Sequence, residues 1–171
     1  MSNIKWFRYE WIWEKDYPTN PYLAKKQVMK RHENLLVFYK NQCTFNPQMT
    51  EREKSKIRNN KKKTYLHRIM DKDFTSTRTG NEKFIYPSSI QKFNRDRKIS
   101  LHPTQKPVAL FEYLIKTYTS VGDVVLDNTI GSGTTAVAAI NTGRNFIGIE
   151  REPEYVKIAE ARMSNLQEVL I

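Results

Sequence analysis

The sequence predicts an α/β fold with a Rossmann-like βαβ unit near the C-terminal end of the chain. Val124 to Leu126 form a short apolar run, which is typical of a strand covered on both faces. A glycine loop containing Gly131 and Gly133 follows, and a second apolar strand ends at Glu150. Nucleotide-binding units share this order, because the loop directs backbone N–H groups at the ligand and the terminal carboxylate can accept ribose hydroxyls.

The glycine loop is a weak signal when it stands alone. Gly131, Gly133 and Ala136 also match the G-x-G-x-x-A pattern of dinucleotide-binding proteins. A simpler alternative is a glycine turn that only lets a helix and a strand pack closely. The stretch 136–140 is expected to be an apolar helix that ends before Gly143.

The N-terminal part predicts two paired strands. Aromatic residues alternate with charged residues over 6–15, which is the period of a half-buried strand. Pro18 and Pro21 are expected to break this strand, and a loop with Lys25, Lys26, Lys30 and Arg31 should follow. The stretch 34–39 is apolar on both faces and predicts an interior strand.

The net charge of +11 is unevenly distributed. Residues 1–50 carry +4, residues 51–100 carry +9 and residues 101–171 carry −2. A basic segment beside a nucleotide-binding unit suits a polyanionic partner. A solvated lysine-rich loop at 51–64 is the alternative. Segment 48–100 shows no steady period, so short strands and loops are expected there.

The single cysteine, Cys43, excludes an internal disulfide, and the scattered histidines show no spacing that suits a metal site. No apolar run is long enough to span a bilayer, and no signal peptide is recognisable, so an intracellular, cytoplasmic protein is expected.

The spacing of apolar residues predicts a helix over 108–118 and a last helix from Pro153, with Lys157, Glu160 and Arg162 facing water.

Two adjacent motifs carry a family resemblance. The first is His-Pro-Thr-Gln-Lys-Pro at 102–107, and the second runs from Asp127 through Gly-Ser-Gly-Thr-Thr at 131–135. In this order they resemble the DNA methyltransferases that modify the exocyclic amine of adenine or cytosine with S-adenosylmethionine. The resemblance points to the branch in which the target-recognition region, here 48–100, precedes the cofactor loop. It implies a double-stranded DNA substrate, with adenine N6 the first target and cytosine N4 the second.

The resemblance also implies roles for single residues toward S-adenosylmethionine. Asp127 would accept from the ammonium group, and Ser132 and Thr134 would donate to the carboxylate beside a helix N-terminus. Glu150 would accept the ribose hydroxyls. The expected cofactor-binding set is Thr104, Lys106, Asp127, Gly131, Ser132, Gly133, Thr134 and Glu150. For Asp127 a plain strand-end turn and for Lys106 a surface lysine remain alternatives.

The sequence departs from the family in two places. Family members commonly have Asp-Pro-Phe where this chain has Asp127, Asn128 and Thr129. The catalytic motif, Asp or Asn followed by Pro-Pro and an aromatic residue, is absent, and it would precede the strand 6–15. The nearest similar stretch, Asn20 to Tyr22, lacks one proline and follows that strand. No catalytic residue is therefore assigned, and the sheet is expected to have a gap with unpaired edges.

The sequence thus predicts a single incomplete methyltransferase domain over 1–171. It comprises paired strands at 1–47, the basic target-recognition segment at 48–100 and the cofactor unit at 101–171. Three interpretations remain: half of a split enzyme whose partner chain carries the catalytic motif, an inactive DNA- or cofactor-binding remnant, or a small dinucleotide-dependent oxidoreductase. The last fits poorly, because its glycine loop would stand near the start of the domain.

Overall fold

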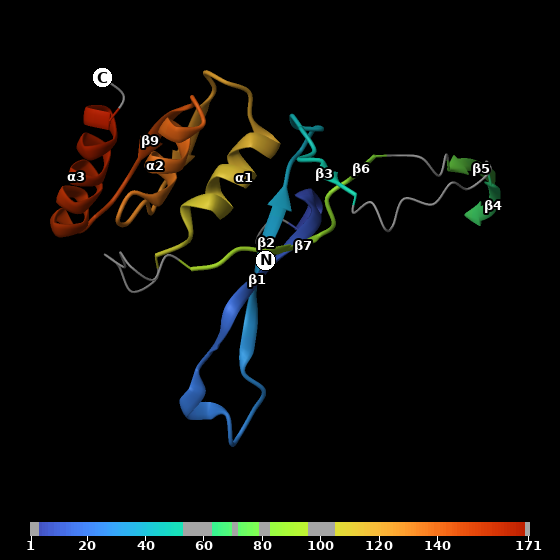
Figure 1. The fold of residues 1–171 in the computed structure, drawn as a ribbon, viewed down its shortest axis with the longest axis horizontal. Coiled ribbons are helices and arrows are strands. Elements are labelled where there is room, and N and C mark those ends of the chain that lie inside the picture. Colours follow the sequence, from blue (N-terminus) through green and yellow to red (C-terminus); the bar gives the residue numbers. More distant parts are fainter. Residues whose placement is uncertain (1–3, 53–62, 70–71, 79–82, 96–104, 170–171) are drawn as a thin grey trace. The chain divides into compact units, whose positions relative to one another are not determined.

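The computed structural model describes residues 4–52, 63–69, 72–78, 83–95 and 105–169 (Figure 1). The chain divides into two compact units, the first comprising Met1–Asn46 and Ser88–Ile171 and the second Pro47–Pro87. No helix within these described ranges is long and apolar enough to cross a membrane.

The first sheet of the larger unit has β1 (Phe7–Thr19) at its centre. It pairs antiparallel with β2 (Lys30–Phe38) and parallel with β7 (Ile90–Lys92). The predicted alternation is confirmed, because Trp11 and Trp13 are only 4% and 2% exposed. β1 runs past Pro18 to Thr19, further than predicted, since a register shift after Glu14 accommodates the missing N–H group of the proline.

Two expectations about β2 are wrong. The strand was expected to be interior, but it is the outer member of its sheet and pairs only with β1 within the described residues. Leu36 and Phe38 are 42% and 39% exposed, so only one face of β2 is covered. Lys30 and Arg31 begin this strand instead of lying in the preceding loop.

The predicted βαβ unit is confirmed. β8 (Val124–Asp127) and β9 (Asn145–Gly148) are parallel, and α2 (Thr134–Asn141) connects them. The expectation that β8 is covered on both faces is wrong, because the side chains of Val124 and Leu126 are 58% and 64% exposed. One face of β8 contacts the core and the other has no neighbour in the part of the chain that the structure describes.

The predicted gap is present as two separate sheets: β8 and β9 are not hydrogen-bonded to β2, β1 or β7. The helix α1 (Val108–Tyr118), at the predicted bounds, contacts both sheets. On one side Ile115 packs with Ala138 and Ala139 of α2. On the other, the rings of Tyr113 and Trp11 lie edge to face with centroids 5.9 Å apart. α3 (Pro153–Val169) packs against α2.

The smaller unit consists of short strands, as expected for an irregular segment. β3 (Thr50–Glu51) pairs antiparallel with β6 (Phe84–Ile85), and β4 (Lys63–Ile69) pairs antiparallel with β5 (Lys72–Arg78). Most of the lysine-rich run 51–64 lies outside the described residues.

Candidate functional site

The loop between β8 and α2 contains both predicted glycines at positive φ. Gly131 has φ of 54° and Gly133 has φ of 81°. Residues other than glycine rarely adopt such backbone conformations. A Cβ on Gly133 would lie 2.8 Å from the Cβ of Ala159 in α3. The missing side chain of Gly133 therefore lets α3 approach the start of α2, which is the packing role that the sequence left open as an alternative.

Glu150 holds this loop in place through its carboxylate. Its Oε2 accepts a hydrogen bond from the Gly131 N–H at 2.8 Å. Its Oε1 accepts from the N–H groups of Arg151 and Glu152 at 2.9 and 3.0 Å. Glu150 lies two residues beyond the end of β9, not at its tip. The carboxylate of Glu150 also lines the cavity described below.

Asp127 ends β8 and faces the start of α2. Its Oδ2 accepts a hydrogen bond from the hydroxyl of Thr135, and its Oδ1 accepts one from the Thr129 N–H at 3.0 Å. These contacts are those of a carboxylate that fixes a turn at the end of a strand. They also fix its orientation at the wall of the cavity described below.

Ser132 and Thr134 are held by a residue that was expected to face water. The guanidinium Nη1 of Arg162 in α3 donates to the carbonyl and the hydroxyl of Ser132, at 2.6 and 3.3 Å, and lies 3.4 Å from the Thr134 hydroxyl. The expectation for Arg162 is wrong, because it stands three positions after Ala159, on the same face of α3. The three-residue spacing of Ala159 and Arg162 in the sequence therefore indicated that Arg162 lies on the packed face of α3. Gln105, also not predicted, accepts from the Ser132 hydroxyl at 3.4 Å.

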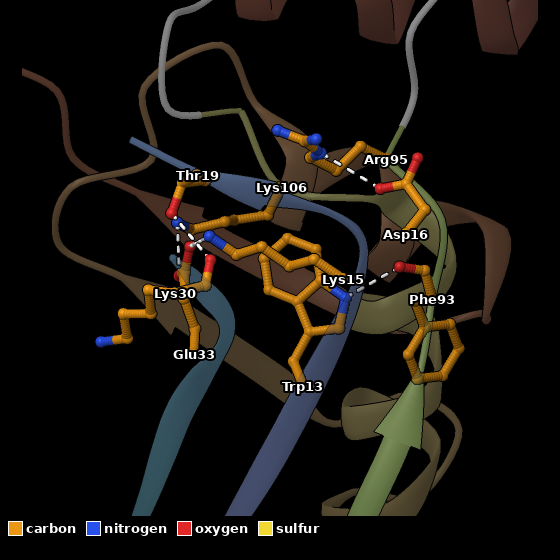
Figure 2. A network of polar contacts seen from close by, with 9 residues as sticks. All are labelled: Trp13, Lys15, Asp16, Thr19, Lys30, Glu33, Phe93, Arg95 and Lys106. Carbon is orange, nitrogen blue, oxygen red and sulfur yellow. Dashed lines mark hydrogen bonds and ion pairs between the residues drawn. The ribbon is translucent and has the colours of Figure 1, made fainter. Parts of the chain in front are cut away.

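Lys106 belongs to an ionic network instead of pointing freely toward the loop. Figure 2 shows the ammonium groups of Lys106 and Lys15 both directed at the carboxylate of Glu33, at 2.8 and 2.5 Å. Burial raises the pKa of Glu33, but the hydrogen bonds and charges of the two lysines outweigh it, so that the pKa is lower than its ordinary value. The backbone carbonyl of Lys106 accepts from the Thr134 hydroxyl at 3.5 Å.

A cavity of about 1220 Å³ lies between α1 and the ends of β8 and β9. Apolar residues of α1, β8 and the following loops form much of its wall. Tyr118 is one of the lining residues; its hydroxyl accepts a hydrogen bond from the Trp11 indole at 2.5 Å, and burial raises its pKa. The predicted site residues in the lining are Lys106, Asp127, Gly131, Ser132, Thr134 and Glu150.

Two predicted site residues do not contribute to this lining. Gly133 is turned toward α3, as described above. Thr104 lies outside the described residues. The structure thus brings together two carboxylates, two hydroxyls and the start of a helix around one cavity, an arrangement that can hold a ligand with hydroxyl, ammonium and carboxylate groups.

Comparison with known proteins identifies a family. The model of the N6/N4 methyltransferase family, described as DNA methylase, matches residues 1–161. The Type II methyltransferase M2.DpnII of Streptococcus pneumoniae is 55% identical over 62 residues, which is 36% of this chain and 23% of that protein. M2.LlaDCHI of Lactococcus lactis subsp. cremoris is 43% identical over 82 residues, or 48% of this chain and 30% of that protein.

Solved structures agree with the family match. The M1.HpyAVI-SAM complex is 30% identical in sequence to this chain and has a TM-score of 0.57. The match covers 91% of this chain and 61% of that chain. The cytosine-N4-specific PvuII DNA methyltransferase is 18% identical over 88% of this chain and 49% of its own length, with a TM-score of 0.61, and so bears on the fold alone. The chain spans less than two thirds of the length of these proteins.

Proposed function

The chain belongs to the N6/N4 family of DNA methylases, and from this premise we propose that it forms the S-adenosylmethionine-binding and DNA-contacting part of a DNA methyltransferase. The observation that carries the proposal is the cavity lined both by Asp127, at the start of the glycine loop, and by Glu150, whose carboxylate is hydrogen-bonded to Gly131 in that loop. When bound, S-adenosylmethionine supplies an electrophilic methyl group. This chain's residues bind the rest of the molecule and orient it.

The donors and acceptors of the cavity fit the functional groups of S-adenosylmethionine. Glu150 and Asp127 both line the cavity, where the Glu150 carboxylate would accept the ribose hydroxyls and the Asp127 carboxylate would accept from the ammonium group. The hydroxyls of Ser132 and Thr134, at the start of α2, suit the carboxylate. Phe111 and Ile149 line the same cavity and can cover the adenine ring.

The substrate that we propose is double-stranded DNA, with adenine N6 as the first target and cytosine N4 as the second. Contact would come from the basic segment 51–100, in the branch order of target-recognition region before cofactor loop. If about five cations meet phosphates, log K should fall against log salt with a slope of about −4 to −5. Replacing Lys61, Lys62 and Lys63 with alanine should make the slope shallower. Work on cellular DNA implies a cytoplasmic location.

Methyl transfer needs a second element that the sequence does not contain. The 171 residues include no consecutive prolines and therefore no Pro-Pro-aromatic loop to hold a flipped base. We infer that a separate stretch of protein carries this loop and completes the sheet beside β8, whose one partner strand among the described residues is β9. Flipping alone costs a few kcal/mol, which that loop would offset by stacking and base-edge contacts. Without it, the chain should bind S-adenosylmethionine weakly and transfer no methyl groups.

Titration calorimetry tests the proposed cofactor site. The Glu150→Gln variant removes the charge that would meet the ribose hydroxyls, so the affinity for S-adenosylmethionine should fall at least about tenfold. Glu154→Gln, an exposed carboxylate in the first turn of α3, is the matched control and should bind as the wild type does. Equal affinities for all three proteins would refute the role of Glu150, and no heat from the wild type would refute the cofactor assignment.

A methyl-transfer assay tests the need for the second element. Radiolabelled methyl groups from S-adenosylmethionine are counted on duplex DNA, with and without a segment that carries the missing motif and ends before a strand like β1. Label should appear only with the segment, and nucleoside analysis then distinguishes N6-methyladenine from N4-methylcytosine. Robust transfer by the 171-residue chain alone would contradict the proposal and direct attention to Asn20, Pro21 and Tyr22.

A further inference from the structure

The turn that joins β1 to β2 is an exposed surface that none of the functions above uses. We call residues 20–31 the hairpin tip; it includes the short 3-10 helix η2 (Pro21–Leu23) and the first residues of β2. Every residue of the hairpin tip is exposed. The side chains of Tyr22 and Val28 are 97% and 92% exposed, far more than large apolar groups usually are in a folded domain.

The hairpin tip is also strongly basic. It carries Lys25, Lys26, Lys30 and Arg31 and contains no Asp or Glu. Arg31 lies 3.8 Å from Glu14, but the three lysines have no acidic partner within ion-pair distance among the described residues. A local charge of +4 next to exposed tyrosine and valine side chains fits a polyanion that also presents apolar surface, as the sugars and base edges of DNA do.

The base of the hairpin is anchored beside the candidate site. Lys15 and Lys106 share Glu33, and Arg95 donates to Asp16 at 3.2 Å (Figure 2). The indole of Trp13 donates to the Phe93 carbonyl at 2.9 Å. These contacts join β1 and β2 to the segment that leads into the cavity wall at Lys106. The direction in which the hairpin leaves the site is therefore fixed by charged and buried groups.

The hairpin extends beyond its anchored base by a length that can be compared with duplex DNA. β1 continues from Lys15 to Thr19, which is about 13 Å of strand at about 3.3 Å per residue. Duplex DNA carries one charge per about 1.7 Å of its axis, so this reach crosses about four base pairs. The strand is thus long enough to place the hairpin tip about four base pairs from its anchored base.

We propose that the hairpin tip is a DNA contact, in which Lys25, Lys26 and Lys30 neutralise phosphates beside the target site and Tyr22 packs on the sugar or base surface. It is separate from the basic segment 51–100 and rests on the proposed DNA substrate. An acidic protein or an anionic lipid surface would attract the same charges, and both are outcomes of the test. DNA is favoured because the family acts on DNA and because the hairpin is anchored at the cavity wall.

Fluorescence anisotropy of a labelled duplex over a salt series tests the proposal on the full 171-residue chain. The double variant Lys25→Ala with Lys26→Ala should lose about 1.8 from the magnitude of the log–log salt slope, about 0.9 for each phosphate contact. The matched control is Lys116→Ala with Lys157→Ala, two exposed lysines on α1 and α3, and its slope should equal that of the wild type. Tyr22→Ala should weaken binding at least about fivefold at every salt concentration with the slope unchanged.

The possible outcomes distinguish a failure of the hairpin-tip proposal from a failure of the proposed function. Wild-type binding to DNA with an unchanged slope in the Lys25, Lys26 variant would overturn the hairpin tip alone. No DNA binding by the wild type at low salt would overturn the DNA substrate together with the tip. Binding to phosphatidylserine vesicles or to a polyglutamate peptide that the double variant loses, without a change in DNA binding, would assign the tip to those partners instead. Circular dichroism should show identical folds, because the replaced side chains are exposed.

Discussion

Replacing Gly133 with alanine tests whether α3 fixes the glycine loop. Gly133 has φ of 81°, and a Cβ there would lie 2.8 Å from the Cβ and 3.0 Å from the Cα of Ala159. The left-handed conformation costs an L-residue about 1–2 kcal/mol, and overpacking costs about 1–3 kcal/mol. We expect the free energy of unfolding to fall by about 2–5 kcal/mol, and S-adenosylmethionine binding to weaken because α3 must shift.

Gly122 offers a matched control. Its φ is 87°, but a Cβ there would meet nothing within 4 Å, so Gly122→Ala should lose only the conformational part, about 1–2 kcal/mol. Combining Gly133→Ala with Ala159→Gly removes the 2.8 Å contact but leaves the Cα at 3.0 Å and places a glycine inside α3 at a cost of about 1 kcal/mol, so it should recover part of the loss. Urea denaturation, followed by the fluorescence of the buried Trp11 and Trp13, measures the free energy of unfolding of the wild type and the three variants. An equal loss at Gly133 and Gly122, or no recovery in the double variant, would refute the packing argument.

Two further predictions concern the groups around the loop. Arg162→Ala removes three contacts to Ser132 and Thr134, so calorimetry should find weaker S-adenosylmethionine binding. Denaturation should find that the free energy of unfolding falls by about 1–3 kcal/mol. Lys157 is exposed on the same helix, and Lys157→Ala should change neither quantity. Because the pKa of Glu33 is lowered in the folded state, its stabilisation is present above the ordinary value of 4.5 and is lost as pH falls through the lowered pKa. Glu33→Gln should therefore cost about 1–2 kcal/mol at neutral pH. Denaturation in acid should show the two proteins converging as pH falls through the lowered pKa of Glu33, and a pH-independent difference would contradict the ionic network.

The elements that the sequence predicts best are those with local signals. The bounds of α1 agree with the apolar spacing from Val108 to Tyr118, and α2 begins where the glycine loop ends. Errors occur where burial depends on distant partners. The apolar runs in β2 and β8 predicted strands covered on both faces, yet Leu36 and Leu126 are exposed, because neither strand has described neighbours on that side.

The candidate site was predictable as a set of residues but not as a set of contacts. Asp127, Ser132, Thr134 and Glu150 line one cavity, as the order of strand, loop and strand implies. The sequence could not show that Lys106 pairs with Glu33, since 73 residues separate them and the contact depends on how β2 meets the segment before α1.

Hydrogen–deuterium exchange with and without saturating S-adenosylmethionine is the most direct test of the proposed cofactor site. The account predicts slower exchange in peptides that cover 127–135 and 149–152, where the Gly131 N–H and the carboxylate of Glu150 already meet. Exchange at the hairpin tip, residues 20–31, should be unchanged. Protection confined to regions outside 127–135 and 149–152, or its absence at concentrations that saturate binding in calorimetry, would contradict the assignment of the loop as the cofactor site.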